Sequence, residues 1–278
     1  MIEILTDSTC DLPAELIKPY PIQVLPFLVM WDGRTYRDRV DLTPADFYAR
    51  LRASSRLPTT GLAGPEQFAA AFRSACERGA SAVVVITIAS QLSGAAGMAL
   101  QASAGSPIPV HIHESGGTTM GMGWQVLAAA RTSAAGGSLA DVLAAAERVR
   151  RRVRVYALLD TLEFAFRGGR LSRISYMVGS ALNFKGLISI EHDCGSVRVI
   201  GRARGKSRAV EMLYERFFDS ADMQHIAVLH GDAESDAREL YEQVRIQHNP
   251  AELLFNSTGP ILGTHTGPGA LALAGYSE

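Results

Sequence analysis

The first part of the chain alternates short apolar runs with amphipathic segments, a pattern typical of strands followed by helices. Residues 2–5 and 82–88 are mostly apolar, and 82–88 is typical of a strand that is buried on both faces of a parallel sheet. Residues 110–113 repeat this pattern, and each run leads through a polar loop into a helical segment. The sequence therefore predicts a mostly parallel sheet flanked by helices over residues 1–152.

The pattern changes after Arg152. Residues 187–191 and 197–200 flank Asp193-Cys194-Gly195-Ser196, which is typical of an antiparallel hairpin. Helices expected near 207–220 and 234–247 alternate with strands expected at 226–230 and 253–256. We therefore expect an α/β protein with a second, mixed domain over residues 153–278, built on a largely antiparallel sheet.

Local signals predict several turns and helix starts. Asp32-Gly33 lies between two extended segments and predicts a two-residue hairpin turn. Asp11 is expected to cap a helix that has Pro13 in its first turn. Residues 56–64 are expected to form a loop.

Composition narrows the classes of function. The chain has 278 residues, 47% hydrophobic and 20% charged, enough for one large domain or two modest ones. Its formal net charge of −1 offers no field that would attract nucleic acid or an anionic membrane, so we expect peripheral or no membrane contact. We see no secretion signal, and the longest apolar run, residues 82–89, is too short to span a bilayer. Cys10, Cys76 and Cys194 indicate neither a disulfide framework nor a zinc site. These features predict a cytoplasmic protein.

Hydroxyl-rich loops follow the predicted parallel strands. They are Thr6-Asp7-Ser8-Thr9, Ser90-Gln91-Leu92-Ser93-Gly94 and Ser115-Gly116-Gly117-Thr118-Thr119. Such loops gather at the carboxyl edge of a parallel sheet, where free backbone N–H groups favour an anion. Each loop taken alone is also explained as a helix cap, because serine and threonine are preferred there.

Other motifs resemble nucleotide or metal sites, and we reject them. Gly267-x-Gly269-x-x-Ala272 lacks room for the βαβ unit that a dinucleotide site requires. The segment 201–207 has one residue too few between its glycines for a phosphate loop, and is interpreted as a basic turn before a helix. His111 and His113 share one face of a strand without a third ligand nearby, so no metal is expected. His265, among glycine, threonine and proline residues, remains a candidate functional side chain held by a tight turn.

Seven short blocks, taken in order, resemble the DegV family over nearly the whole chain. The blocks are Thr6-Asp7-Ser8-Thr9-Cys10-Asp11-Leu12-Pro13, Leu57-Pro58-Thr59-Thr60, Gln91-Leu92-Ser93-Gly94, Arg167-Gly168-Gly169-Arg170-Leu171-Ser172, Leu182-Asn183-Phe184-Lys185, Gly201-Arg202-Ala203-Arg204-Gly205 and His265-Thr266-Gly267-Pro268-Gly269-Ala270. The resemblance implies a bacterial protein that binds one long-chain fatty acid in a buried tunnel between two domains. It implies no cofactor and no catalysis without a partner.

The resemblance also implies a site and a partner. Thr60, Ser93 and His265 match the residues that bind the carboxylate, and Arg170 and Arg202 match arginines near the head group and the kinase-docking surface. A separate ATP-binding kinase subunit would phosphorylate the bound carboxylate for phospholipid synthesis. A buried carboxylate needs charge-assisted hydrogen bonds, which the hydroxyls of Thr60 and Ser93, the Gly94 backbone N–H and the imidazole would supply.

Two departures from the family pattern, and two alternatives, accompany this interpretation. Gly61-Leu62-Ala63 replaces the usual Ser-Gln-Pro after Thr60, which removes a polar contact and puts the kinase step in question. Glu114 replaces an aspartate before the third loop.

One alternative function is a hydrolase or acyltransferase that uses Ser93 as nucleophile and His265 as base. The other is a lipid buffer or sensor that has no kinase partner.

Overall fold

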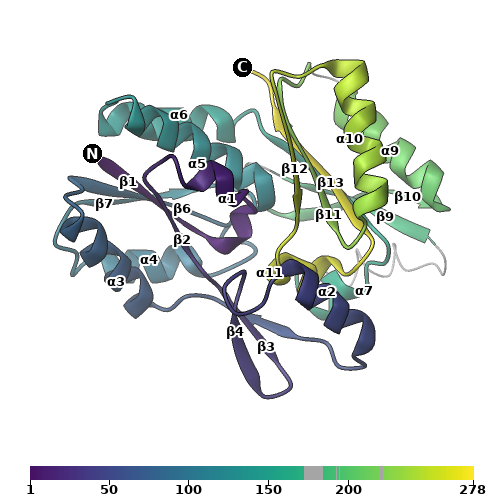
Figure 1. Cartoon of the computed structure of the whole chain (residues 1–278), viewed down its shortest axis with the longest axis horizontal. Coiled ribbons are helices and arrows are strands. Elements are labelled where there is room, and N and C mark those ends of the chain that lie inside the picture. The colour runs from purple at the N-terminus through teal and green to yellow at the C-terminus, as the bar shows by residue number, and fades with distance from the viewer. Residues whose placement is uncertain (172–183, 192, 194, 220–221) are drawn as a thin grey trace.

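Two sheets lie side by side in the computed structural model, one from each half of the chain (Figure 1). The structure describes residues 1–171, 184–191, 193, 195–219 and 222–278. Ser172 and Leu182-Asn183 of the family blocks, and Cys194 of the predicted hairpin, therefore lie outside the described residues. None of the described helices is both long and apolar enough to cross a lipid bilayer.

The first sheet is parallel throughout, as the apolar runs predicted. Its order is β2 (Ile22–Leu25), β1 (Ile2–Asp7), β6 (Ala82–Thr87) and β7 (Val110–Glu114). Helices α3 (Pro65–Glu77) and α4 (Ala95–Ser103) lie on one side of it, and α5 (Thr119–Ala134) and α6 (Leu139–Arg150) on the other (Figure 1). This arrangement brings the three hydroxyl-rich loops to one edge of the sheet.

The second sheet is antiparallel except at one pair of strands. Its order is β10 (Val197–Arg204), β9 (Phe184–Ile190), β8 (Arg154–Leu159), β13 (Ala270–Tyr276), β11 (His225–Gly231) and β12 (Glu252–Ser257). Only the β11–β12 pair is parallel among the described strands of this sheet. Helices α9 (Lys206–Phe218) and α10 (Glu234–His248) pack against it. The predicted α/β class, and the predicted 187–200 hairpin, are confirmed.

A small third sheet projects from the first half of the chain (Figure 1). It contains β3 (Leu28–Trp31), β4 (Arg34–Arg37) and β5 (Thr59–Gly61), with α2 (Pro44–Ala53) between β4 and β5 in the chain. The predicted hairpin turn is confirmed, because Asp32 and Gly33 both have the positive φ angles that such a turn needs. The loop expected at 56–64 is partly wrong. Thr59–Gly61 pairs with β3, which places Thr60 opposite Val29.

Other local predictions were also wrong. Asp11 caps no α-helix: it has a left-handed φ of 49° after the short 3₁₀ helix η1 (Ser8–Cys10), and α1 (Ala14–Ile17) begins after Pro13 without a side-chain cap. The basic turn expected over 201–207 is the second half of β10 up to Arg204, because this segment pairs with β9. Helix α11 (Pro260–Thr266) and strand β13 were not predicted.

Helix α5 holds the two halves together. It contacts β1 and β6 of the first sheet and β8 and β13 of the second, and its described residues are almost all buried. The indole Nε1–H of Trp124 donates to the carbonyl of Ala274 across this interface, at 3.1 Å. Gly121 allows close approach, because a Cβ there would overlap the side chain of Val155 on β8.

We therefore expect Gly121→Ala to destabilise the protein by about 1–3 kcal/mol, since the added methyl group overpacks a core interface. Urea unfolding will measure the change. Gly97→Ala is the matched control, because Gly97 lies within helix α4 on its solvent-exposed side, with open space around it. This control should stabilise the protein by about 0.5–1 kcal/mol. Equal effects of the two substitutions would contradict the close packing of α5.

Candidate functional site

An apolar cavity of about 110 Å³ lies where the two halves of the chain meet. Apolar side chains from both halves form most of its wall: Phe27, Leu62, Ile88, Leu92, Leu159, Ala165, Ile188, Ile190, Val197, Ile261 and Leu262. A second cavity of about 60 Å³ shares Thr118, Ile188, Ile190, Leu262 and Thr266 with the first and continues beside β11 and β13. The two cavities together provide an apolar space that runs along the interface between the sheets.

The cavity brings together four of the side chains predicted from the sequence. Thr60 on β5, Ser93 before α4, Arg170 after α7 (Glu163–Arg167) and His265 on α11 all line it. They come from segments far apart in the chain, and the fold brings them to a cavity whose lining is otherwise mostly apolar. The arrangement offers hydroxyl, imidazole and guanidinium groups to the polar end of an otherwise apolar ligand.

The hydroxyl of Thr60 and the imidazole of His265 are hydrogen-bonded to each other. Thr60 Oγ1 and His265 Nε2 are 3.0 Å apart. Burial, and secondarily the positive charge of Arg170, lower the pKa of His265 from 6.5 to about 4. The imidazole is therefore neutral near neutral pH and is available for hydrogen bonding.

Arg170 bridges the two halves beside this pair. Its Nε donates to the carbonyl of Leu92 at 3.2 Å, and its Nη1 donates to the carbonyl of Gly168 at 2.7 Å. The segment that carries Arg170 ends α7, with Gly169 at a φ of 73° just after the helix. The arginine thereby attaches the end of α7 to the loop that carries Ser93.

Gly168 is a site residue that the sequence analysis missed. A Cβ at this position would overlap the Nδ1 edge of the His265 ring. That nitrogen is buried and has no hydrogen-bond partner within the described part of the chain. The absence of a side chain at 168 therefore lets α7 press against the imidazole. The glycine pair in the sequence signals a helix end but carries no sign of this contact.

Each of the three hydroxyl-rich loops contributes to the cavity, through Thr9, Ser93 and Thr118. A buried carboxylate, Asp7, and an exposed one, Glu114, hold the first two loops in place. Asp7 accepts hydrogen bonds from the Thr9 hydroxyl at 2.5 Å and from the Ile88 backbone N–H at 2.9 Å. Glu114, despite its longer side chain, accepts from the Ser90 N–H at 2.9 Å. Asp7 is thus a positioning residue that the sequence analysis placed in a loop without a role.

Two predicted residues lie outside the cavity wall. Gly94 is the N-terminal cap residue of α4, next to Ser93, and is exposed. Arg202 lies on β10 with an exposed side chain.

His111 and His113 lie on β7, where His113 Nε2 and Gln125 Oε1 are 3.0 Å apart. No cluster of histidine, cysteine and carboxylate groups suited to a metal ion occurs among the described residues.

We expect Gly168→Ala to push the His265 ring out of its buried position. Contact with water favours the imidazolium, so the pKa of His265 should rise from about 4 toward its ordinary value of 6.5. An NMR titration of the ring protons will measure it. Gly105→Ala, in open space after α4, is the matched control and should leave that pKa unchanged. An unchanged value in folded Gly168→Ala would contradict the contact.

Comparisons with known proteins agree with this architecture. A family model described as an uncharacterised protein of the DegV family matches residues 1–278. A DegV domain-containing protein of Streptomyces coelicolor is 32% identical over 275 residues, which cover 98% of this chain and 97% of that protein. The solved structure of a DegV family protein from Thermus thermophilus, described as fatty-acid-binding, is 33% identical, covers 100% of this chain and 99% of that chain, and has a TM-score of 0.89. DegV of Bacillus subtilis, described as a fatty acid binding protein, is 26% identical, covers 99% of both chains and has a TM-score of 0.90. The chain belongs to the DegV family.

Proposed function

We propose that this protein binds one long-chain fatty acid, with the acyl chain in the interface cavity and the carboxylate at Thr60, Ser93 and His265. The observation that carries the proposal is an apolar cavity whose wall gathers hydroxyl, imidazole and guanidinium groups from distant segments. The Thermus thermophilus and Bacillus subtilis relatives, both described as fatty-acid-binding, support the same ligand class.

The energetics divide between the tail and the head group. Each buried methylene contributes about 0.8 kcal/mol, so the acyl chain supplies most of the affinity. The carboxylate loses its hydration and needs donors in return. If His265 Nε2–H donates to Thr60 Oγ1, the threonine hydroxyl proton is left to donate to the ligand. Ser93 supplies a second hydroxyl and Gly94 a backbone N–H beside it, and Arg170 adds a nearby positive charge.

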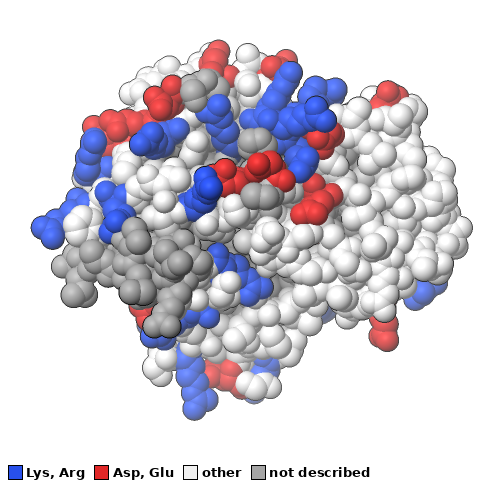
Figure 2. All heavy atoms as spheres, turned by 180° about the vertical axis from the view of Figure 1, so that it is seen from behind, with Lys and Arg blue, Asp and Glu red and all other residues white. Residues whose placement is uncertain are grey.

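We further propose that the bound carboxylate is presented to a separate ATP-binding kinase subunit. Arg170 is exposed at the head-group wall and Arg202 is exposed on β10, so both are open to a partner. Figure 2 shows lysine and arginine interspersed with aspartate and glutamate over one side of this face, while the other side is mostly uncharged. Exposed arginines on such a surface favour a partner with acidic groups or a bound nucleotide. Gly61 and Leu62, which replace polar family residues, lie at the cavity wall and leave it apolar there.

The alternative of a serine hydrolase or acyltransferase receives less support. A nucleophilic serine needs a base within hydrogen-bond reach, and that base is normally oriented by a third group. Here His265 Nε2 is bonded to Thr60, and its Nδ1 has no partner among the described residues. The pKa of about 4 also makes this imidazole a weak base. A lipid buffer or sensor without a kinase uses the same binding site and differs only in its partner.

Native mass spectrometry of the purified protein, followed by denaturing extraction, tests the ligand class. We expect a bound mass that matches a long-chain fatty acid, or uptake of one when it is added. A protein that is empty and takes up no fatty acid would overturn the proposal. Labelling of Ser93 by a serine-reactive probe would instead support the enzyme alternative.

Ser93→Ala tests the head group. Loss of a hydrogen bond to a charged group costs about 1.5–3 kcal/mol, so fatty acid affinity should fall about ten- to hundredfold while some lipid is retained. Acyl phosphate formation with the kinase subunit and ATP should fall as well. Ser103→Ala, at the far end of α4, is the matched control and should change neither quantity. Unchanged phosphorylation in Ser93→Ala would refute the assigned role.

A further inference from the structure

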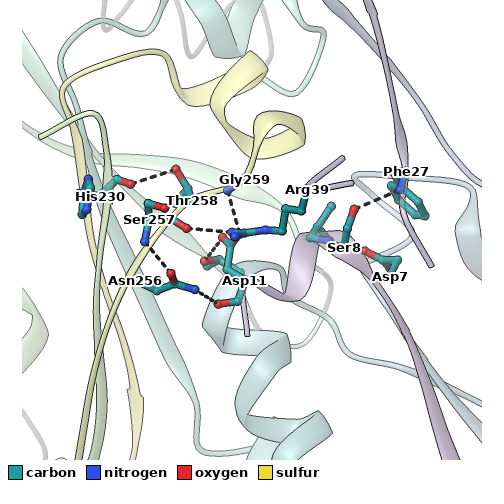
Figure 3. Close-up of polar contacts among 12 residues, drawn as sticks. Asp7, Ser8, Asp11, Phe27, Arg39, His230, Asn256, Ser257, Thr258 and Gly259 are labelled. Atoms are coloured by element: carbon teal, nitrogen blue, oxygen red, sulfur yellow. Dashed lines mark hydrogen bonds and ion pairs between the residues drawn. The ribbon is translucent and has the colours of Figure 1, made fainter. Parts of the chain in front are cut away.

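A partly buried ion pair of the first half makes hydrogen bonds to the second half next to the proposed site (Figure 3). The Nη2 group of Arg39 donates to Asp11 Oδ1 at 2.6 Å and to the carbonyl of Ser257 at 2.8 Å. The Gly259 backbone N–H donates to the same Asp11 oxygen at 2.9 Å. Arg39 and Asp11 belong to the first half, whereas Ser257 and Gly259 belong to the second. We call this group of contacts the latch.

Asp11 makes further contacts that complete the latch. Its Oδ2 accepts from the hydroxyl of Thr119 at the start of α5, at 2.8 Å, and its carbonyl accepts from Asn256 Nδ2 at 2.7 Å. The side chain of Asp11 is wholly buried. Asp11 and Arg39 both have positive φ angles, of 49° and 60°, a conformation that non-glycine residues keep only where surrounding contacts hold them.

The latch contacts the start of the helix that carries His265. Gly259 is the N-terminal cap residue of α11, and this short helix carries His265 in its last turn. Asp11 therefore holds the start of the helix whose end presents the imidazole to Thr60. A shift of α11 relative to the first half would separate the Thr60–His265 pair and open the cavity wall that Ile261 and Leu262 form.

Asp38 adds an unpaired carboxyl group to the latch. Its side chain is buried, and neither of its oxygens has a hydrogen-bond partner among the described residues. The Nε of Arg39 is likewise buried without a partner there. A Cβ built on Gly259 would lie 2.9 Å from Arg39 Nε and 3.1 Å from Asp38 Oδ1, so both groups pack around this glycine.

The charges of this region do not balance when all three of its carboxyl groups are ionised. Asp7, Asp11 and Asp38 are all buried, and Arg39 is the basic side chain that faces them among the described residues. Burial of an uncompensated carboxylate is costly, and a group in that position takes up a proton instead. Burial raises the pKa of Asp38 to about 7, against the opposing effects of the Ser8 hydroxyl and Arg39. Burial likewise raises the pKa of Asp7 to about 6.

The other titratable groups facing the latch are uncharged near neutral pH. Burial raises the pKa of the Cys10 thiol to about 12 and also raises the pKa of the Tyr48 phenol. His265, on the other end of α11, is neutral because its pKa is about 4. Asp38 and Asp7 are therefore the groups whose charge changes in this region, and Asp38 is the one that adjoins Arg39 and Gly259.

We propose that Asp11 and Arg39 are positioning residues for the head-group site, and that the latch stays closed only while Asp38 carries a proton. Ionised Asp38 competes with Asp11 for Arg39, which weakens the hold on Gly259 and releases α11. The proposal rests on the proposed function, because it makes entry and release of the fatty acid depend on pH through this latch. The latch itself exists without a ligand and is tested separately.

The direction in which pH changes the stability of the closed latch follows from the pKa values of Asp38 in the closed and opened states. In the closed state its pKa is about 7, and in an opened, hydrated state it returns toward 3.8. The closed state therefore binds a proton that the opened state does not, and its advantage is lost as the pH rises through about 7. Because the opened state releases this proton, the equilibrium constant for opening rises about tenfold between about pH 6 and about pH 8.

Hydrogen exchange of the ligand-free protein tests the latch. After correction for the intrinsic pH dependence of exchange, amides of residues 259–266 should open about tenfold more at the higher pH. Asp38→Asn cannot ionise and should remove this dependence. Asp41→Asn is the matched control, since Asp41 is partly exposed and paired with Arg37 in the same segment, and it should retain the dependence. Equal opening of the wild type at both pH values, or an unchanged dependence in Asp38→Asn, would overturn the proposal.

Release of a bound long-chain fatty acid, followed by stopped flow, tests the link to the ligand. The release rate of the wild type should rise about tenfold over the same pH range, and that of Asp38→Asn should stay at the low value. Asp11→Asn should release the ligand faster at both pH values. A pH-independent release rate in the wild type would contradict the proposed latch without contradicting the proposed function. Failure to bind any fatty acid would contradict the proposed function, and the hydrogen-exchange experiment would still test the latch.

Discussion

The burial of helix α5 between the two sheets is the constraint on which the rest of the structure depends. Its contacts with β1 and β6 on one side and β8 and β13 on the other fix how the halves meet. Gly121 permits that approach, and the Trp124 hydrogen bond ties the helix to β13. The cavity lies along the same interface, so its shape is set by packing and not by any one loop. Thr118, the cap residue of α5, lines both parts of the cavity.

Electrostatics give the cavity an unusual character for a proposed carboxylate site. The imidazole near the head group is neutral, and three buried aspartates lie behind the loops. In the proposed function, affinity for a carboxylate would therefore come from hydrogen bonds and from the nearby charge of Arg170, while the tail would supply the larger share of the free energy. Asp7 links these two regions. It holds Thr9 and Ile88 at the cavity wall and belongs to the same acidic group as Asp11 and Asp38.

Local patterns predicted well where one strong preference acts, and failed where tertiary contacts override it. The parallel apolar runs, the Asp32-Gly33 turn and the 187–200 hairpin were confirmed, since burial and turn geometry dominate there. Aspartate is a common helix cap, which is why the sequence predicted that role for Asp11. Its carboxylate instead accepts hydrogen bonds from Arg39, Thr119 and Gly259 in the latch. The segments at 59–61 and 201–204 carry turn-like residues and become strands because a neighbouring strand supplies their hydrogen bonds.

The sequence by itself determined the fold class, many of the helices and strands, the family and the four side chains, Thr60, Ser93, Arg170 and His265, that line the cavity. These follow from periodicity and from short motifs, which are properties of neighbouring residues. Only the tertiary structure decided that Gly168 presses on His265, that Asp7 braces two loops, and that Asp38 is buried without a partner beside Arg39. The reason is physical: burial, and the pKa values that depend on it, arise from residues far apart in the chain and leave no mark on local sequence.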